Sequence, residues 1–343
     1  MKRTRFGILG AGWRAEFYLR VASALPDRFV CGGIYVRNPD TAARLRATGA
    51  PVMTEYESFC AGGYDFVVCC VRSGEILSAA RDLVARGYAV LCETPAGRTL
   101  EQLHAERDLI PATARVQVAE QYLYQPEFAA ARALSESGLL GPVHYVRISA
   151  AHEYHGVSLV RGLLGVGTAF PDRILGMEID DPVRRVLGRP GRLPGSDVVS
   201  KQTIGILRFG QKSALLDFTG EQYFSPIRSG SLLMRGPRGE YSDGKLCYLD
   251  AQDEPVRLTR TRVEFGRGTD LGGYALDRIC FGPHVLYRNP YPQARLSDEE
   301  LAVAGMLEGM QTYLATGRSF YSLAEERLDC EIAYRIREVA SGA

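Results

Sequence analysis

The sequence lacks the features that mark several large classes of protein. No apolar stretch is long enough to cross a bilayer, and there is neither an internal repeat nor a low-complexity tract. Positive and negative side chains nearly balance, with 41 Lys and Arg against 40 Asp and Glu and a net charge of +1. A balanced surface does not recruit nucleic acid or a membrane by charge, so we expect neither as a partner.

Cysteine and histidine also lack the spacing of a metal site. The eight cysteines include no C-x-x-C pair, and the five histidines are scattered along the chain. Several cysteines lie in apolar runs, where a free thiol acts as a small hydrophobe, so we expect reduced cysteines and no metal. The basic N-terminus leads into a short apolar segment interrupted by glycine, which predicts a cytoplasmic protein without a signal peptide.

The most informative feature that is present lies within fifteen residues of the N-terminus. An apolar run with strand character leads into Gly10-Ala-Gly-Trp-Arg-Ala15, and apolar residues then recur at helical spacing. This is the strand–turn–helix setting of a dinucleotide-binding fingerprint. Gly10 permits the tight turn, and Gly12 lets the backbone approach a pyrophosphate at the helix N-terminus. The alternative is a glycine-rich turn that holds no ligand.

The pattern of apolar residues predicts two domains of the α/β class. Up to residue 121, strands alternate with helices in the βαβ manner, and runs such as Phe66–Val71 lack polar alternation. We predict a doubly wound parallel Rossmann sheet over residues 1–121, with its ligand outside the carboxyl ends of the strands.

Residues 122–343 are predicted to form an α+β domain with a mostly antiparallel open sheet. Its last helix is a candidate to pack back on the first domain. The Gly- and Pro-rich segment 187–200 and the segment 252–292 are predicted as loops that shape substrate specificity. Segments 297–316 and 322–341 are predicted as helices, each with a serine cap.

These stretches together resemble the Gfo/Idh/MocA family (glucose–fructose oxidoreductase/inositol dehydrogenase). The resemblance covers nearly the whole chain and rests on segments 10–15, 35–39, 87–95, 137–143 and 155–165. It implies a Rossmann domain and an α+β domain whose open sheet often forms the oligomer interface. It also implies hydride transfer between a nicotinamide dinucleotide and a sugar, polyol or related alcohol. We therefore expect a small, carbohydrate-like substrate and a homo-oligomer, either a dimer or a tetramer.

Two positions depart from the catalytic pattern of this family. Relatives carry Glu-Lys-Pro where this chain has Glu93-Thr94-Pro95, so a cation that assists the reaction is missing. The acid that relatives place four residues before the motif histidine is Ala151 here, and His155 remains. Because imidazole titrates near working pH, His155 is the expected general base or acid, assisted by Tyr154 and Thr94. The alternative is a histidine with a purely structural role.

The end of the second predicted strand indicates the type of cofactor. NAD enzymes favour an acid there, whereas NADP enzymes replace it and place an arginine nearby. This chain has Val36 followed by Arg37, which favours NADP over NAD, although arginine also occurs beside the acid in NAD-binding relatives. The predicted cofactor-binding residues are Gly10, Ala11, Gly12, Trp13, Arg14, Val36, Arg37, Val71, Arg72, Ser73, Glu93, Thr94 and Gln121.

Polar and aromatic residues at strand ends are candidate substrate contacts, namely His152, Tyr122, Gln222 and Tyr223. The alternatives are an interdomain hinge at residues 120–122 and interface aromatics at 221–223. The predicted function is an NAD(P)-dependent oxidoreductase acting on a sugar, glycoside or cyclitol-like alcohol or ketone. Two alternatives stay open: a redox-neutral enzyme that cleaves glycosidic bonds through transient oxidation, and a catalytically silent dinucleotide-binding sensor or scaffold.

Overall fold

The computed structural model describes residues 3–95, 97–105, 109–189, 191–266, 268–270 and 272–342. The chain divides into two compact units, and neither is continuous in sequence. The first unit comprises Met1–Pro126, Glu264–Asp277 and Asn289–Arg327, and the second comprises Glu127–Val263, Arg278–Arg288 and Leu328–Ala343. The division after residue 121 stays a prediction.

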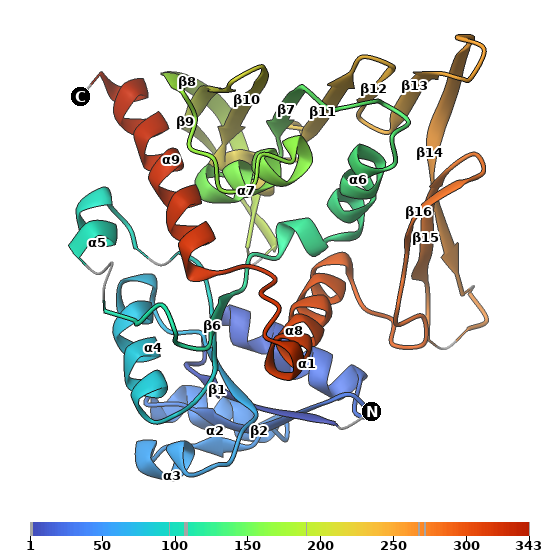
Figure 1. The fold of residues 1–343 in the computed structure, drawn as a ribbon. Coiled ribbons are helices and arrows are strands. Elements are labelled where there is room, and N and C mark those ends of the chain that lie inside the picture. Colours follow the sequence, from blue (N-terminus) through green and yellow to red (C-terminus); the bar gives the residue numbers. More distant parts are fainter. Residues whose placement is uncertain are drawn as a thin grey trace. The chain divides into compact units, whose positions relative to one another are not determined.

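The first unit contains a six-stranded parallel sheet with the order β3-β2-β1-β4-β5-β6 (Figure 1). Strand β4 is buried along its whole length, which explains why its sequence lacks polar alternation. The order reverses at β1, so the carboxyl ends of β1 and β4 form the switch point at which such sheets bind ligands. The strands are β1 (Thr4–Leu9), β2 (Phe29–Tyr35), β3 (Val52–Met53), β4 (Phe66–Cys69), β5 (Val90–Cys92) and β6 (Val116–Val118).

Helices lie between these strands, in the βαβ alternation that the sequence predicts. Residues 106–108, which follow α5 along the chain, lie outside the described part of the chain. The elements are α1 (Trp13–Ala24), α2 (Pro39–Ala47), α3 (Tyr56–Cys60), η1 (Ser73–Glu75), α4 (Ile76–Ala85), α5 (Leu100–Ala105) and η2 (Tyr122–Tyr124).

A helix from the C-terminal part of the chain completes the first unit. Helix α8 (Asp298–Thr316) lies beside α1, and the two are drawn side by side in Figure 1. Ser297 begins it as predicted, because its backbone N–H donates to the Glu300 carboxylate at 2.8 Å and its hydroxyl accepts from the Glu300 N–H at 3.3 Å. The Arg20 guanidinium on α1 reaches the same carboxylate at 2.5 Å.

The second sheet has ten strands in the order β16-β15-β14-β13-β12-β11-β7-β10-β9-β8. Strands β8–β9, β9–β10 and β11–β12 are antiparallel, which confirms the predicted mostly antiparallel sheet, and the β7–β10 pair is parallel. Its elements, with the helices around it, are α6 (Pro126–Glu136), β7 (Tyr145–Ser149), α7 (Glu153–Leu164), β8 (Arg173–Gly188), β9 (Gly191–Phe209), β10 (Lys212–Thr219), η3 (Gly220–Tyr223), β11 (Ser231–Gly236), β12 (Gly239–Ser242), β13 (Lys245–Leu249), β14 (Pro255–Phe265), β15 (Ala275–Phe281), β16 (His284–Arg288) and α9 (Leu323–Ser341).

The prediction of loops is wrong for both segments, because each consists largely of β-strands. Segment 187–200 belongs to the long β8–β9 hairpin, in which Arg184 faces Asp197 and Leu187 faces Arg192. Proline is tolerated at 194 because β9 pairs with β10 only from Gln202 onward, so within the described residues the second edge of this part of β9 has no strand beside it. Segment 252–292 contains β14, β15 and β16, and its alternation of Val and Leu with Arg and Thr over 256–260 has the period of a strand.

Helix α7 packs against β7 and β10 and positions the histidine motif of the second unit. Its apolar side chains Val157, Val160 and Leu163 are buried, and the helix ends at Gly165 in the left-handed conformation (φ 61°). Arg161 on this helix donates to the buried Asp329 on α9 at 2.6 Å. These contacts fix α7 within the second unit.

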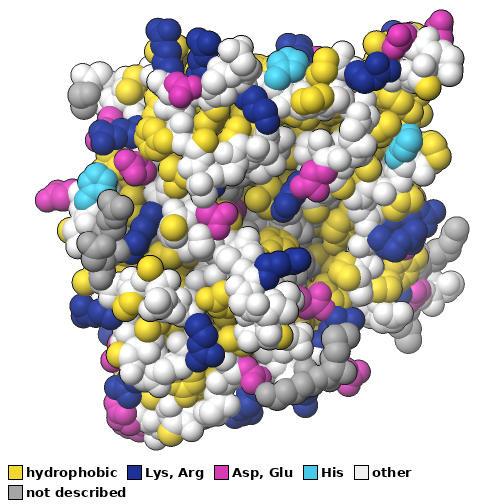
Figure 2. Space-filling view, in the orientation of Figure 1, with side chains coloured by type: hydrophobic (Ala, Val, Ile, Leu, Met, Phe, Trp, Pro, Cys, Tyr) yellow, Lys and Arg dark blue, Asp and Glu magenta, His cyan; other side chains and the backbone are white. Residues whose placement is uncertain are grey.

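Basic and acidic side chains are interspersed over the face shown in Figure 2, with no large patch of one sign. This agrees with the formal net charge of +1. Among the described residues, no helix is both long and apolar enough to cross a membrane.

Candidate active site

A cavity of about 910 Å³ opens at the carboxyl ends of β1, β2, β4 and β5 in the first unit. It is bounded by the glycine turn after β1, the residues after β2, the segment after β4 and the Glu93–Thr94 pair after β5. All the predicted cofactor-binding residues line it except Ser73 and Gln121. The sequence did not single out Tyr35, Asn38, Thr41 and Tyr56, which line the part beside β2.

The fold requires glycine at position 10 but not at position 12. Gly10 has φ +101°, and a Cβ there would lie 2.7 Å from the Cys70 carbonyl oxygen, so the fold itself requires glycine. Gly12 has φ −70° and caps α1, and a Cβ there would meet no atom within 4 Å. Glycine at 12 therefore leaves open space at a helix N-terminus that has no side-chain cap, which fits the path of a pyrophosphate.

The end of β2 carries no acid, as the sequence indicates. Val36 is buried, whereas Arg37 is exposed and lies 3.7 Å from the Glu75 carboxylate. The Asn38 side chain accepts from the Thr41 backbone N–H at 2.9 Å and caps α2. Arg37 is thus a surface cation at the edge of the cavity, and its ion pair with Glu75 is exposed and of small energy.

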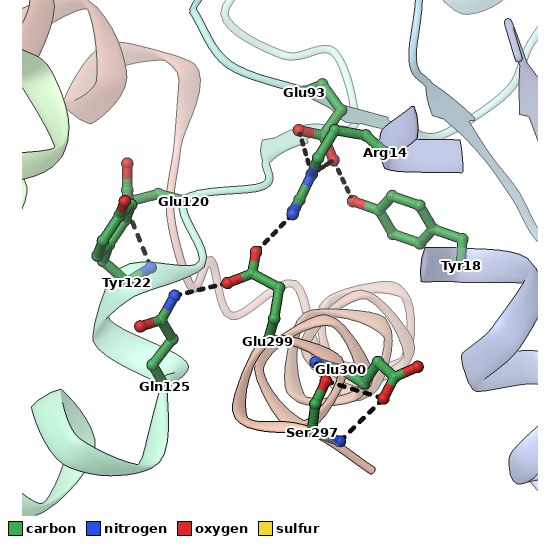
Figure 3. A network of polar contacts seen from close by, with 9 residues as sticks. All are labelled: Arg14, Tyr18, Glu93, Glu120, Tyr122, Gln125, Ser297, Glu299 and Glu300. Carbon is green, nitrogen blue, oxygen red and sulfur yellow. Dashed lines mark hydrogen bonds and ion pairs between the residues drawn. The ribbon is translucent and has the colours of Figure 1, made fainter. Parts of the chain in front are cut away.

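A polar network lies at the β5 side of the cavity (Figure 3). The Arg14 Nε lies 3.3 Å from both oxygens of Glu93, and its Nη1 donates to Glu299 at 2.5 Å. Tyr18 also donates to Glu93 at 2.6 Å, and Gln125 donates to the second oxygen of Glu299 at 2.6 Å. Burial alone would lower the pKa of Arg14, but the neighbouring Glu93 and Glu299 carboxylates raise it above its usual range, so the guanidinium stays charged.

Three other predicted residues of the first unit, Thr94, Gln121 and Tyr122, lie close in sequence to members of this network. Thr94 is half-buried, lines the cavity and precedes Pro95 across a cis peptide bond. Gln121 is buried, and its side-chain oxygen Oε1 accepts no hydrogen bond within the described structure. Tyr122 is also buried, and its backbone N–H donates to Glu120 at 3.1 Å.

In the second unit, the start of α7 carries an aromatic and histidine cluster. His155 is only 5% exposed, and its ring centroid lies 4.3 Å from that of Tyr154 and 5.0 Å from that of His152. The Tyr223 hydroxyl lies 2.5 Å from the His152 Nδ1 and accepts from the His152 backbone N–H at 3.1 Å. Ala151, at the position where relatives carry an acid, is buried.

This cluster borders a cavity of about 400 Å³ inside the second unit. His152, Phe218 and Tyr223 line it together with Lys201 and Arg337. Both cations are paired, Lys201 with Asp180 at 2.7 Å and Arg337 with Glu153 at 2.9 Å. The cavity therefore offers neutral hydrogen-bonding groups and aromatic rings rather than a net charge.

Gln222 does not line either cavity. Its amide nitrogen donates to the Ser149 hydroxyl at 2.9 Å and to the Ser229 carbonyl at 3.0 Å, and its oxygen accepts from the Thr219 N–H at 2.9 Å. These bonds hold the η3 turn that carries Tyr223. Its predicted role as a substrate contact stays a prediction. Among the described residues, no group of three or more His, Cys, Asp or Glu side chains is arranged to hold a metal.

His152 makes folding stability depend on pH. Burial and the neighbouring His155 lower the pKa of His152 to about 3. Its usual pKa is about 6.5, so the unfolded chain binds this proton more readily and stability is lost as the pH falls below about 6.5. Between pH 7.5 and 5, protonation of His152 in the unfolded chain should lower the free energy of unfolding of the wild type by a contribution on the order of 2 kcal/mol. His152→Asn should lack this contribution, as urea unfolding of the two proteins at both pH values would show. His144→Asn, at an exposed position, is the control and should keep the wild-type dependence of unfolding free energy on pH. If wild type and His152→Asn lost the same unfolding free energy between pH 7.5 and 5, the role of His152 would be contradicted.

Residues 4–120 match the Gfo/Idh/MocA oxidoreductase family, NAD-binding Rossmann fold. The rhizopine catabolism protein MocA of Rhizobium meliloti is 29% identical over 151 residues, which are 43% of this chain and 46% of that protein. The match thus spans about half the length of that relative.

Several solved structures share the fold over nearly the whole chain. Levoglucosan dehydrogenase in complex with NADH and levoglucosan is 18% identical, with a TM-score of 0.69 over 99% of this chain and 98% of that one. An oxidoreductase from Agrobacterium radiobacter, in complex with NAD+, L-tartaric acid and magnesium, is 14% identical, with a TM-score of 0.66 over 99% and 97% of the two chains.

The Rossmann match, the fold and the glycine turn agree with the resemblance found in the sequence. The chain therefore carries, in residues 4–120, a Rossmann domain that matches the Gfo/Idh/MocA oxidoreductase family, NAD-binding Rossmann fold.

Proposed function

We propose that this protein is an NAD(P)-dependent oxidoreductase that transfers a hydride to or from a sugar, glycoside or cyclitol-like alcohol or ketone. The observation that carries the proposal is the cavity at the switch point of the first sheet, where Gly12 leaves the N-terminus of α1 open. Levoglucosan dehydrogenase, which shares the fold, binds NADH together with levoglucosan, and this supports a sugar-like substrate.

The residues of the first unit would bind and orient the dinucleotide. The backbone amides at the N-terminus of α1 would hold the pyrophosphate, and the residues after β2 would hold the adenosine half. Glu93, Thr94 and Gln121 would adjoin the nicotinamide half, on the opposite side of β1 from β2. The dinucleotide, when bound, supplies or accepts the hydride.

Oxidation of an alcohol also releases the hydroxyl proton, which needs an acceptor at the reacting oxygen. We assign this proton to His155, whose imidazole is buried beside Tyr154. Thr94 would donate a hydrogen bond to the reacting oxygen in place of the lysine of relatives. His152 and Tyr223 line the cavity of the second unit and would hydrogen-bond to substrate hydroxyl groups while His152 stays neutral.

NADP is the proposed cofactor because β2 ends in Val36 and the exposed Arg37 rather than an acid. The exposed Arg37 guanidinium could bind a 2′-phosphate, and the only interaction in the described structure that it would give up is an exposed, weak ion pair with Glu75. The homo-oligomer, the carbohydrate-like class of substrate and the cytoplasmic location expected from the sequence stay predictions.

Mixing the purified protein with NAD or NADP and a panel of sugars, polyols and glycosides tests the proposal. We expect absorbance at 340 nm to rise with at least one alcohol, and NADP to bind more tightly than NAD in calorimetric titrations. A clear preference for NAD would overturn the cofactor assignment alone. Release of aglycone without net reduction would favour the redox-neutral alternative, and binding without any turnover would favour the silent sensor.

A further inference from the structure

Arg14 is the buried cation of the dinucleotide cavity. Three arginines line the cavity among the described residues, and Arg37 and Arg72 are exposed, whereas the Arg14 side chain is only 12% exposed. Its Nε and Nη1 are held by Glu93 and Glu299, but its Nη2 is buried without a hydrogen-bond partner in the described structure. A buried donor of this kind carries a desolvation cost that a bound acceptor would relieve.

The position of Arg14 along the sheet indicates which part of a dinucleotide it would meet. The pyrophosphate belongs at the N-terminus of α1, after β1, and the adenosine half belongs beside β2. The sheet order β2-β1-β4-β5 places β5 on the opposite side of β1. Because Arg14 pairs with Glu93, the residue that follows β5, its guanidinium lies toward the nicotinamide half.

The Oε1 atom of Gln121 is a second buried polar atom without a hydrogen-bond partner in the described structure. It is a hydrogen-bond acceptor, whereas the Arg14 Nη2 is a donor. The main chain of Gln121 is linked to the network around Arg14, because Glu299 accepts from the Arg14 and Gln125 side chains and the Gln125 backbone N–H donates to the Gln121 backbone carbonyl at 3.2 Å. A carboxamide presents one acceptor oxygen and one donor NH2 group, which is the complement of this pair.

We propose that Arg14 and Gln121 form a clamp for the nicotinamide carboxamide, an inference that rests on the proposed dinucleotide function. The Arg14 Nη2 donates to the carboxamide oxygen, and the carboxamide NH2 donates to the Gln121 Oε1. Glu93 and Glu299 hold the guanidinium in place, and the rings of Trp13 and Phe17 lie 5.3 Å from its central carbon. The clamp fixes the orientation of the ring and places a cation near it in a chain that lacks the lysine at position 94.

Calorimetric titration separates this role from a structural one. The first ligand is NAD or NADP, whichever the wild type binds more tightly. The second is ADP-ribose for NAD, or its 2′-phosphate for NADP, and this second ligand lacks the nicotinamide. Arg14→Met should raise the dinucleotide Kd by about 10- to 100-fold and leave the ADP-ribose Kd within about 2-fold. Arg20→Met is the matched control, because Arg20 lies on the same helix and pairs with α8 but does not line the cavity, so both Kd values should stay at wild type.

A ligand with an acetyl group in place of the carboxamide tests the two halves of the clamp separately, because it keeps the oxygen and lacks the NH2. Gln121→Leu should weaken binding of the normal dinucleotide but not of this acetylpyridine analogue, whereas Arg14→Met should weaken both. If Arg14→Met does not fold, Arg14→Lys should show the same pattern with a smaller change. Equal weakening of dinucleotide and ADP-ribose, or no change in either, would overturn the clamp; a wild type that binds neither ligand would overturn the proposed function itself.

Discussion

Gly12→Asp is expected to weaken dinucleotide binding by at least about 100-fold without lowering the melting temperature, because a like charge set against an anion costs several kcal/mol. The backbone at Gly12 has φ −70° and ψ 175°, which any residue adopts, and a Cβ there meets nothing within 4 Å. Aspartate is also a favoured N-cap, so α1 should be as stable as before or slightly more stable. The new carboxylate would occupy the space where the pyrophosphate would bind and repel it.

Gly10→Ala and Gly12→Asn are the controls for this result. Gly10→Ala should lower the melting temperature as well as binding, since its Cβ would lie 2.7 Å from the Cys70 carbonyl oxygen at φ +101°. Gly12→Asn has the shape of aspartate without its charge and should show an intermediate loss of affinity. The measurements are calorimetric Kd values and thermal unfolding of each variant. Wild-type affinity in Gly12→Asp would show that the dinucleotide does not pass the N-terminus of α1.

The contrast between these two glycines shows what the sequence can predict. The spacing of Gly10 and Gly12 after an apolar strand is a local pattern, and it led to the fold of the first domain and the cavity position. The sequence alone could not show that Gly10 serves the fold while Gly12 leaves space for a ligand. That distinction depends on Cys70, whose backbone follows a different strand of the sheet.

The polar network around Arg14 was beyond sequence reasoning for the same reason. The glycine turn predicts that position 14 binds cofactor, but its partners Glu93 and Glu299 are 79 and 285 residues away along the chain. Only packing of α8 against α1 brings Glu299 to the network. No pattern in the sequence marks one glutamate at the start of a helix as the partner of a distant arginine.

The β8–β9 hairpin shows a different limit. Glycine and proline in segment 187–200 favour loops, and this preference is correct for strands that have partners on both sides. The hairpin extends past the end of β10, so its backbone needs fewer hydrogen bonds and tolerates Pro194. Tertiary context therefore overrode the local preference, and segments predicted to be loops became part of the sheet.

His155→Asn is expected to lower kcat by about 10²- to 10⁴-fold, the usual contribution of a positioned general base. Asparagine keeps a polar side chain of similar size, but it cannot take the proton that leaves the substrate hydroxyl. Dinucleotide Kd should stay at the wild-type value, because the residues assigned to cofactor binding are unchanged. Wild-type turnover in this variant would remove His155 from the mechanism.

The surroundings of His155 provide controls that separate proton transfer from packing. The Ser158 hydroxyl donates to the His155 carbonyl at 2.9 Å, so Ser158→Ala perturbs the same turn of α7 without changing the imidazole. We expect Ser158→Ala to keep kcat within a few-fold of wild type, and Tyr154→Phe to lower it less than His155→Asn does. The pH profile of kcat/KM should lose one limb only in His155→Asn, because a packing defect lowers the rate at every pH whereas loss of the base removes its titration. An unchanged profile in that variant would identify His155 as structural and leave Tyr154 as the candidate for proton transfer.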